Sequence, residues 1–120
     1  MKVIIAGSRN FENYPLLVQK LDRILKYCDK VEIVSGAARG ADELGELYAV
    51  ENHLNLRRFH ADWDGLGNSA GYIRNEEMAK YADALIAFWD GRSRGTKHMI
   101  DLARKYNLKV RVIRFDQTSS

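Results

Sequence analysis

The stretch that most constrains the fold of this chain is VEIVSGAARGAD, which runs from Val31 to Asp42. Its first residues are mostly β-branched, which is typical of a buried β-strand. Gly36 and Gly40 then bracket a turn in which the main chain can be approached closely. The helix expected to follow directs its free N–H groups and the positive end of its dipole back at that turn. A strand, a glycine-containing loop and a helix N-terminus in this order form an anion site, usually for phosphate, and Arg39 adds a fixed positive charge.

The same alternation of strand and helix continues along the chain. We expect strands at Lys2–Ala6, Val31–Ser35, Leu56–His60, Ala84–Trp89 and Lys109–Ile113. Strands that alternate with helices at this spacing predict right-handed parallel βαβ units, and hence an α/β fold with a three-layer, doubly wound sheet of five parallel strands. The first, second and fourth strands are the most apolar and therefore central, which predicts the strand order 3-2-1-4-5.

Length and composition indicate one domain. The chain has 120 residues, enough for one core, and we assign residues 1–115 to that domain and 116–120 to a polar tail. No apolar run approaches the ~20 residues of a membrane span, and a strand at the N-terminus leaves no room for a signal peptide. The single cysteine fits a reducing compartment. We therefore expect a cytoplasmic protein without a membrane partner.

The charge of the chain is only mildly basic. A formal net charge of +3 is compatible with ligands that carry phosphate. A nucleic-acid-binding protein would be expected to carry a dense Lys/Arg stripe with interleaved aromatic residues, whereas the basic residues here are scattered. We therefore do not expect nucleic acid as a partner.

Three loops at the carboxyl ends of the expected strands meet around one crevice, where doubly wound sheets bind their ligands. These loops supply hydroxyl groups, guanidinium groups and main-chain N–H donors. Their candidate ligand-binding residues are Gly7, Ser8, Arg9, Ser35, Gly36, Arg39, Gly40, Asp90, Gly91, Ser93, Gly95 and Thr96. Arginine suits such a site because its planar fork meets two phosphate oxygens at once. Tight turns and helix caps would explain any one of these loops, but three loops at adjacent strand ends favour an anion-binding site.

Four further side chains are candidates, each with a structural alternative. Arg74, in the first half of a helix, can reach a phosphate or ribose, or pair with a neighbouring glutamate. Trp63 can stack on a base, act as a lid, or plug the edge of the sheet. Asp42 can bind a ribose hydroxyl or complement the helix terminus, and Asp90 can contact a sugar or orient its glycine loop.

Metal and hydrolytic sites find little support in the sequence. The three histidines, His53, His60 and His98, fall on different elements, and no spacing matches a zinc or calcium motif. We expect no metal and no resident cofactor. Ser8 or Ser35 with His60 would form a nucleophile–base pair, which is a weaker alternative.

Five motifs together resemble one known family. They are GSRxF at 7–11, SGxARGAD at 35–42, ADW at 61–63, AGxxRNxxM at 70–78 and FxDGxSxGT at 88–96. The combination covers nearly the whole chain and resembles the YspA/YpsA-related branch of the SLOG superfamily. The resemblance implies a Rossmann-like domain that binds nucleotides or nucleotide-derived ligands and self-associates. Relatives include the LOG phosphoribohydrolases, also called lysine decarboxylase-like proteins, and DprA.

The resemblance also assigns roles to particular residues. The loop at 91–96 is similar to the LOG phosphate loop, and Arg74-Asn75 is similar to a LOG helix whose arginine contributes to catalysis. LOG enzymes carry acidic residues after Gly-Thr, one of them catalytic, whereas Lys97–Met99 stand there in this chain. Cleavage of an N-glycosidic bond would need another carboxylate, and Asp42 and Asp90 are the candidates with Arg74.

Three functions follow from these observations. The first is a module that senses or sequesters a nucleotide or an NAD/ADP-ribose-like derivative. The second is an enzyme that cleaves a nucleotide at its N-glycosidic bond. The third is single-stranded nucleic-acid binding of the DprA kind, which would show steep salt dependence.

Overall fold

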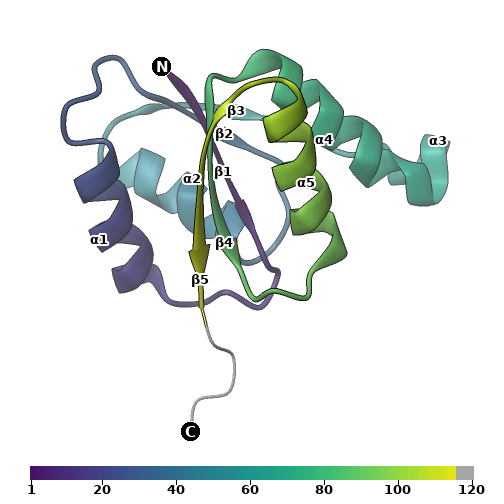
Figure 1. Ribbon diagram of the computed structural model, residues 1–120, viewed down its shortest axis with the longest axis horizontal. Helices are drawn as coiled ribbons and strands as arrows, with labels where there is room; N and C mark the ends of the chain where they lie inside the picture. Colours follow the sequence, from purple (N-terminus) through teal and green to yellow (C-terminus); the bar gives the residue numbers. More distant parts are fainter. Residues whose placement is uncertain (116–120) are drawn as a thin grey trace, which may run out of the picture.

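The computed structural model describes residues 1–115, so the expected polar tail at 116–120 lies outside the described residues. Strands and helices alternate along the chain (Figure 1). The elements are β1 (Lys2–Gly7), α1 (Tyr14–Ile24), β2 (Glu32–Ser35), α2 (Ala41–Glu51), β3 (Asn55–Arg58), α3 (Trp63–Leu66), η1 (Gly67–Ser69), α4 (Ala70–Tyr81), β4 (Ala84–Trp89), α5 (Arg94–Lys105) and β5 (Lys109–Arg114).

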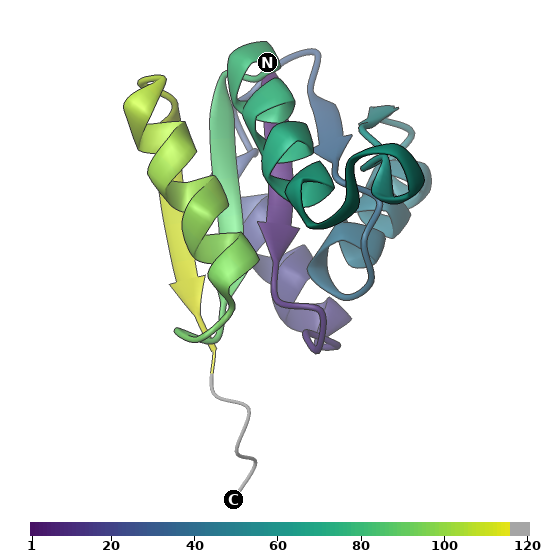
Figure 2. The same cartoon turned by 90° about the vertical axis from the view of Figure 1, so that its right-hand side faces the viewer.

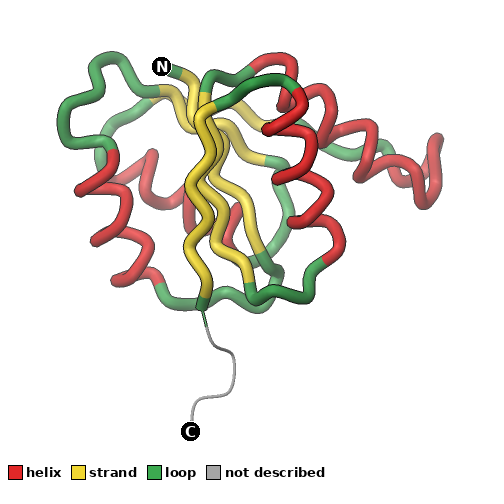
Figure 3. The backbone as a smooth tube through the Cα atoms, in the orientation of Figure 1, coloured by secondary structure: helices red, strands yellow, loops and turns green. Residues whose placement is uncertain are grey.

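The five strands form one parallel sheet in the order β3-β2-β1-β4-β5. The predicted α/β fold, strand number and strand order are therefore confirmed. β1 lies at the centre, between β2 and β4, and its side chains alternate between the two faces of the sheet. The tube view shows the helices in two layers on either side of this sheet (Figure 3).

Each face of the sheet is covered by its own pair of helices. Val3 and Ile5 of β1 pack in a cluster with Leu17 and Leu21 of α1 and with residues of α2. Ile4 and Ala6, which point the opposite way, pack with residues of α4 and α5. Because both faces of the central strands are buried, these strands read as continuous apolar runs in the sequence.

The segment between β3 and α4 consists mainly of short helical turns. It contains the one-turn helix α3, followed by the 3₁₀ turn η1. Asp62 caps α3, since its Oδ1 accepts a hydrogen bond of 3.0 Å from the N–H of Gly65. Figure 1 shows α3 beyond the N-terminal end of α4, away from the sheet, and Figure 2 shows α4 and α5 side by side over one face of the sheet. Among residues 1–115, no helix has the length and apolar character needed to span a bilayer.

Candidate functional site

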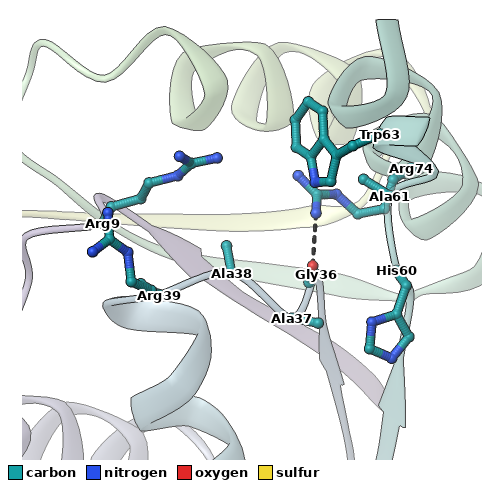
Figure 4. A pocket seen from close by; sticks show the side chains of 9 residues that line it. All are labelled: Arg9, Gly36, Ala37, Ala38, Arg39, His60, Ala61, Trp63 and Arg74. Carbon is teal, nitrogen blue, oxygen red and sulfur yellow. Dashed lines mark hydrogen bonds between the residues drawn. The ribbon is translucent and has the colours of Figure 1, made fainter. Parts of the chain in front are cut away.

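A pocket of about 350 Å³ opens at the carboxyl ends of β2 and β1, where the topology predicted a crevice. We call it the arginine pocket. It is lined by Arg9, Gly36, Ala37, Ala38, Arg39, His60, Ala61, Trp63 and Arg74 (Figure 4). The arginines come from the loop after β1, the loop after β2 and the helix α4, which lie far apart in the sequence. Because the strands are parallel, their carboxyl ends all lie at the same end of the sheet, and this brings the three segments together.

Arg74 is held across the crevice from α4. Its Nη1 donates to the carbonyl oxygen of Gly36 at 2.6 Å, and its Nε donates to Oδ1 of Asn75 at 3.0 Å. Burial lowers the pKa of Arg74, and the carboxyl of Asp42 opposes that shift. Within residues 1–115, ion pairs shorter than 4.0 Å join Arg58 to Glu46 and Lys97 to Asp101. In that part of the chain, the arginines of the pocket therefore have no carboxylate partner at such a distance, and the expected alternative of an Arg74–glutamate pair is not seen.

Asn75 connects Arg74 to the beginning of α5. Its side chain is 5% exposed, and its Nδ2 donates to the carbonyl oxygen of Gly95 at 3.4 Å and lies 3.2 Å from Nδ1 of His98. Burial lowers the pKa of His98, and the carboxylates of Asp101 and Glu76 oppose this shift. The Arg74-Asn75 pair thus ties α4 to the loop after β2 and to the first turns of α5.

Asp42 lies beside the arginine pocket, on the wall of a smaller hollow of about 90 Å³ that also contacts Arg9 and Arg74. The residue is 6% exposed, and its Oδ2 accepts a hydrogen bond of 3.2 Å from the N–H of Ala38. Burial raises the pKa of Asp42 to about 6 and Glu46 adds to the rise, whereas the Ala38 amide, Arg74 and Arg9 oppose it. The pKa of Asp42 therefore lies well above that of an ordinary aspartate.

The loop from Gly36 to Gly40 uses much of its own hydrogen-bonding capacity. Ala37, in a left-handed conformation, donates its N–H to Oγ of Ser35 at 3.0 Å, and Ala38 donates to Asp42. Ser35 is fully buried, and its hydroxyl donates to Oε2 of Glu46 at 2.6 Å. The Ser35 hydroxyl is thus engaged with Glu46 rather than with a histidine. Because two loop amides are taken by protein acceptors, anion binding here rests mainly on the guanidinium groups.

Gly40 joins two of the crevice loops. A Cβ at this position would collide with the carbonyl oxygen of Ser8, and its φ of +80° favours glycine. Ser8 is 1% exposed and accepts a hydrogen bond of 3.2 Å at Oγ from the N–H of Asp90. The loops after β1, β2 and β4 are therefore packed as one unit.

Asp90 and Ser93 shape the loop after β4. Oδ1 of Asp90 accepts hydrogen bonds from the N–H groups of Arg92 and Ser93, at 2.8 and 2.9 Å. Ser93 caps α5, since its Oγ accepts from the N–H of Thr96 at 3.3 Å and lies 2.9 Å from Thr96 Oγ1. These contacts agree with the expectation that Asp90 orients its glycine loop, and a sugar contact stays a prediction.

The structure separates the predicted residues by location. Arg9, Gly36, Arg39, Trp63 and Arg74 line the arginine pocket, and the smaller hollow adds Gly7, Asp42, Asn75, Ser93, Gly95 and Thr96. A third hollow, of about 280 Å³, is lined by Gly40 together with Arg9 and Arg39. Ser8, Ser35, Asp90 and Gly91 are not among the lining residues of these three hollows.

Sequence reasoning missed three lining residues, Ala37, Ala38 and Ala61, and considered His60 only as a base. The alanines carry no chemical signal of their own. Their position in the loops that follow β2 and β3 is the signal that could have identified them, because the loops at the carboxyl ends of the strands border the crevice.

Comparison with known proteins agrees with the motif-based resemblance. The model of the YAcAr family, described as the YspA, cpYpsA-related SLOG family, matches residues 1–65. The gene 61 protein of Mycobacterium phage D29 is 34% identical in an alignment 116 positions long, which covers 91% of this chain and 93% of that protein. This chain belongs to the YspA, cpYpsA-related SLOG family. The family predicted from the motifs is therefore confirmed.

Two solved structures share the fold of this SLOG domain. DNA processing protein A (DprA) from Streptococcus pneumoniae has a TM-score of 0.76 and 19% identity, over 98% of this chain and 52% of that chain. DprA from Helicobacter pylori has a TM-score of 0.69 and 22% identity, over 100% of this chain and 68% of that one. The SLOG domain thus spans about half of the first protein and about two thirds of the second.

These neighbours correct one expectation. The Helicobacter pylori structure is described by the unique single-stranded DNA binding mode of that protein. Excluding nucleic acid because the basic residues are scattered along the sequence was therefore wrong. The physical reason is that sequence spacing does not measure spatial spacing, since Arg9, Arg39 and Arg74 line one pocket.

Proposed function

We propose that this SLOG domain binds a nucleotide by its phosphate in the arginine pocket. One observation carries the proposal: three guanidinium groups from separate segments line a single pocket of about 350 Å³. Among the described residues, none of the three has an ion-pair partner within 4.0 Å. Guanidinium groups recognise phosphate through paired, charge-assisted hydrogen bonds, so a phosphate would supply the missing negative charge.

The roles of the three arginines differ. Arg74 is already fixed by Gly36 and Asn75, so it presents its free edge without further ordering. Among the described residues, the pocket arginine whose side chain makes hydrogen bonds is Arg74, so Arg9 and Arg39 can turn toward a ligand that enters between them. The family resemblance supports a nucleotide or a nucleotide derivative as the carrier of the phosphate, held as a signal or in sequestered form.

Single-stranded nucleic acid is a second candidate for the same pocket. The observation that favours it is the likeness to DprA, one member of which is described as binding single-stranded DNA. A strand would place one of its phosphates on the arginines and others along the crevice. Its affinity would then fall steeply with salt, because several counterions are released, whereas a free nucleotide would show a shallow dependence.

The proposal is tested by isothermal titration of AMP and of a single-stranded decamer into the protein, at low and at moderate salt. Arg74→Ala should weaken phosphate binding by roughly ten-fold or more, since a charged hydrogen bond contributes about 1.5–3 kcal/mol. Arg104→Ala is the matched control, because Arg104 is exposed in the last turn of α5. Equal loss in both variants, or no binding of either probe, would contradict the proposal.

The fate of the ligand separates binding from catalysis. Intact nucleotide released from the heated protein would identify a binding module. Free adenine that accumulates with time would instead identify the hydrolase alternative, for which the buried carboxyl of Asp42 beside Arg74 is the nearest candidate group.

A further inference from the structure

Trp63 is a large aromatic side chain that the fold leaves half exposed beside the arginines. It is 50% exposed and lines the arginine pocket. It is the first residue of α3, which stands away from the body of the molecule (Figure 1). A plug over the edge of the sheet would be expected to be more deeply buried. The position of this indole at the rim of a polar pocket therefore calls for another explanation.

The edge of the indole lies over the glycine at position 71. A Cβ on Gly71 would lie 3.2 Å from Cη2 and 3.8 Å from Cζ2 of Trp63, and 3.7 Å from Nη2 of Arg74. The indole edge and the guanidinium group thus meet over the same point of α4, where an alanine would press on the indole edge and reach Arg74 only at ordinary contact distance. Figure 4 shows Trp63 and Arg74 together on one side of the pocket, with Arg9 and Arg39 on the other.

We propose that Trp63 is the stacking surface for the base of the bound nucleotide. The inference rests on the proposed function, and it deepens that function by assigning the base as the second recognised part of the ligand. A phosphate between the arginines would leave the rest of a nucleotide to lie along the wall that Trp63 and Arg74 form. An indole whose edge packs on α4 still has a face available for a planar ring.

The surroundings of Trp63 also indicate which bases would be accepted. The pocket is lined by the methyl groups of Ala37, Ala38 and Ala61. His60 adds a polar ring to the lining. Stacking tolerates any base because each has a π face, whereas discrimination between bases requires hydrogen bonds to their edges. The ligand class is therefore a base-bearing nucleotide with weak base selectivity, and purines should bind more tightly because they cover more of the indole.

The test compares AMP with ribose 5-phosphate, which carries the same phosphate and sugar without a base. The chain has two tryptophans, so Trp89→Phe leaves Trp63 as the single tryptophan. Binding is followed by its fluorescence in this background. The variants are Trp63→Leu and Trp63→Phe. Tyr72→Leu is the matched control, since Tyr72 is also 50% exposed but lies on α4 against His98 and outside the pocket lining.

We expect AMP to bind about ten-fold more tightly than ribose 5-phosphate and to quench Trp63, in line with the strength of base–aromatic stacking. Trp63→Leu should remove this preference while ribose 5-phosphate still binds, and Trp63→Phe should retain most of it; for these two variants the affinities are measured by isothermal titration. Tyr72→Leu should leave the preference unchanged. A single-stranded decamer and its abasic counterpart should show the same contrast if the base belongs to a strand.

Two results would overturn the inference, and they differ in their meaning. Equal affinities for AMP and ribose 5-phosphate, or a preference that survives Trp63→Leu, would refute stacking and leave phosphate binding intact. Failure of all four probes to bind would refute the proposed function as well. If Trp63 only packs α3 against α4, Trp63→Leu should lower the melting temperature and leave the preference for AMP unchanged. That outcome would also refute stacking.

Discussion

Substitution of Asp42 by asparagine isolates the effect of one buried charge beside the pocket. The asparagine would retain an oxygen to accept the N–H of Ala38 and would lose only the ionisable group. The carboxyl is 6% exposed, and its pKa is raised from 3.8 to about 6, first by burial. We therefore expect Asp42→Asn to stabilise the protein at neutral pH.

The sign follows from proton linkage. Because the folded-state pKa lies above the unfolded value, the native protein binds this proton more tightly than the unfolded chain does. The contribution of Asp42 is neutral below a pH of 3.8, and stability is lost as the pH rises from 3.8 to about 6. A shift of about two pKa units corresponds to a loss of about 3 kcal/mol above that window, which the asparagine variant should not suffer.

The measurement is urea unfolding of both proteins, followed by circular dichroism from pH about 4 to about 8 in buffers without phosphate. The free-energy gap between variant and wild type should grow with pH and level off above the pKa of Asp42. Asp101→Asn is the control, because Asp101 is exposed in a surface pair with Lys97, which contributes less than about 1 kcal/mol. A gap that does not change with pH, or an asparagine variant that is less stable at neutral pH, would refute the reasoning.

Two further predictions concern packing and the loop. Gly45→Ala should destabilise the protein by about 2 kcal/mol, because the added Cβ would lie 2.7 Å from Cβ of Ile5. Gly95→Ala should not destabilise it, because the added Cβ would have nothing within 4 Å, and thermal unfolding of the two variants tests the difference. Ser35→Ala should cost about 2 kcal/mol in chemical unfolding, because the N–H of Ala37 loses its acceptor, and an unchanged stability would show that this amide finds another partner.

The sheet could be predicted from the sequence because its signals are long and redundant. The strands at Lys2–Gly7 and Ala84–Trp89 are apolar on both faces, which requires helices above and below and therefore a central position. The helix α3 could not be predicted in this way. It has four residues, too few to show a period, and depends on a single cap from Asp62 to Gly65.

The site was predictable in its location and less so in its contacts. Topology and glycine placement indicated which loops would meet, and the arginine pocket lies among them. Ser35 and Asp42 accept hydrogen bonds from the backbone N–H groups of Ala37 and Ala38, in a loop where Ala37 is left-handed. An alanine in the sequence does not indicate a left-handed conformation, so these contacts could not be predicted. Nucleotide binding, self-association and a cytoplasmic location stay predictions.

The failed exclusion of nucleic acid shows how charge should be read in a parallel sheet. A Lys/Arg stripe along the sequence is the expected signal when one helix or strand forms the binding surface. In a doubly wound sheet, the surface is instead assembled from the ends of several strands. Arg9 follows β1, Arg39 follows β2 and Arg74 lies on α4, so their spacing in the sequence conceals their common pocket. Cations in such a chain are therefore better counted over all the loops and helices that border the crevice, and that count favours a phosphate ligand for this SLOG domain.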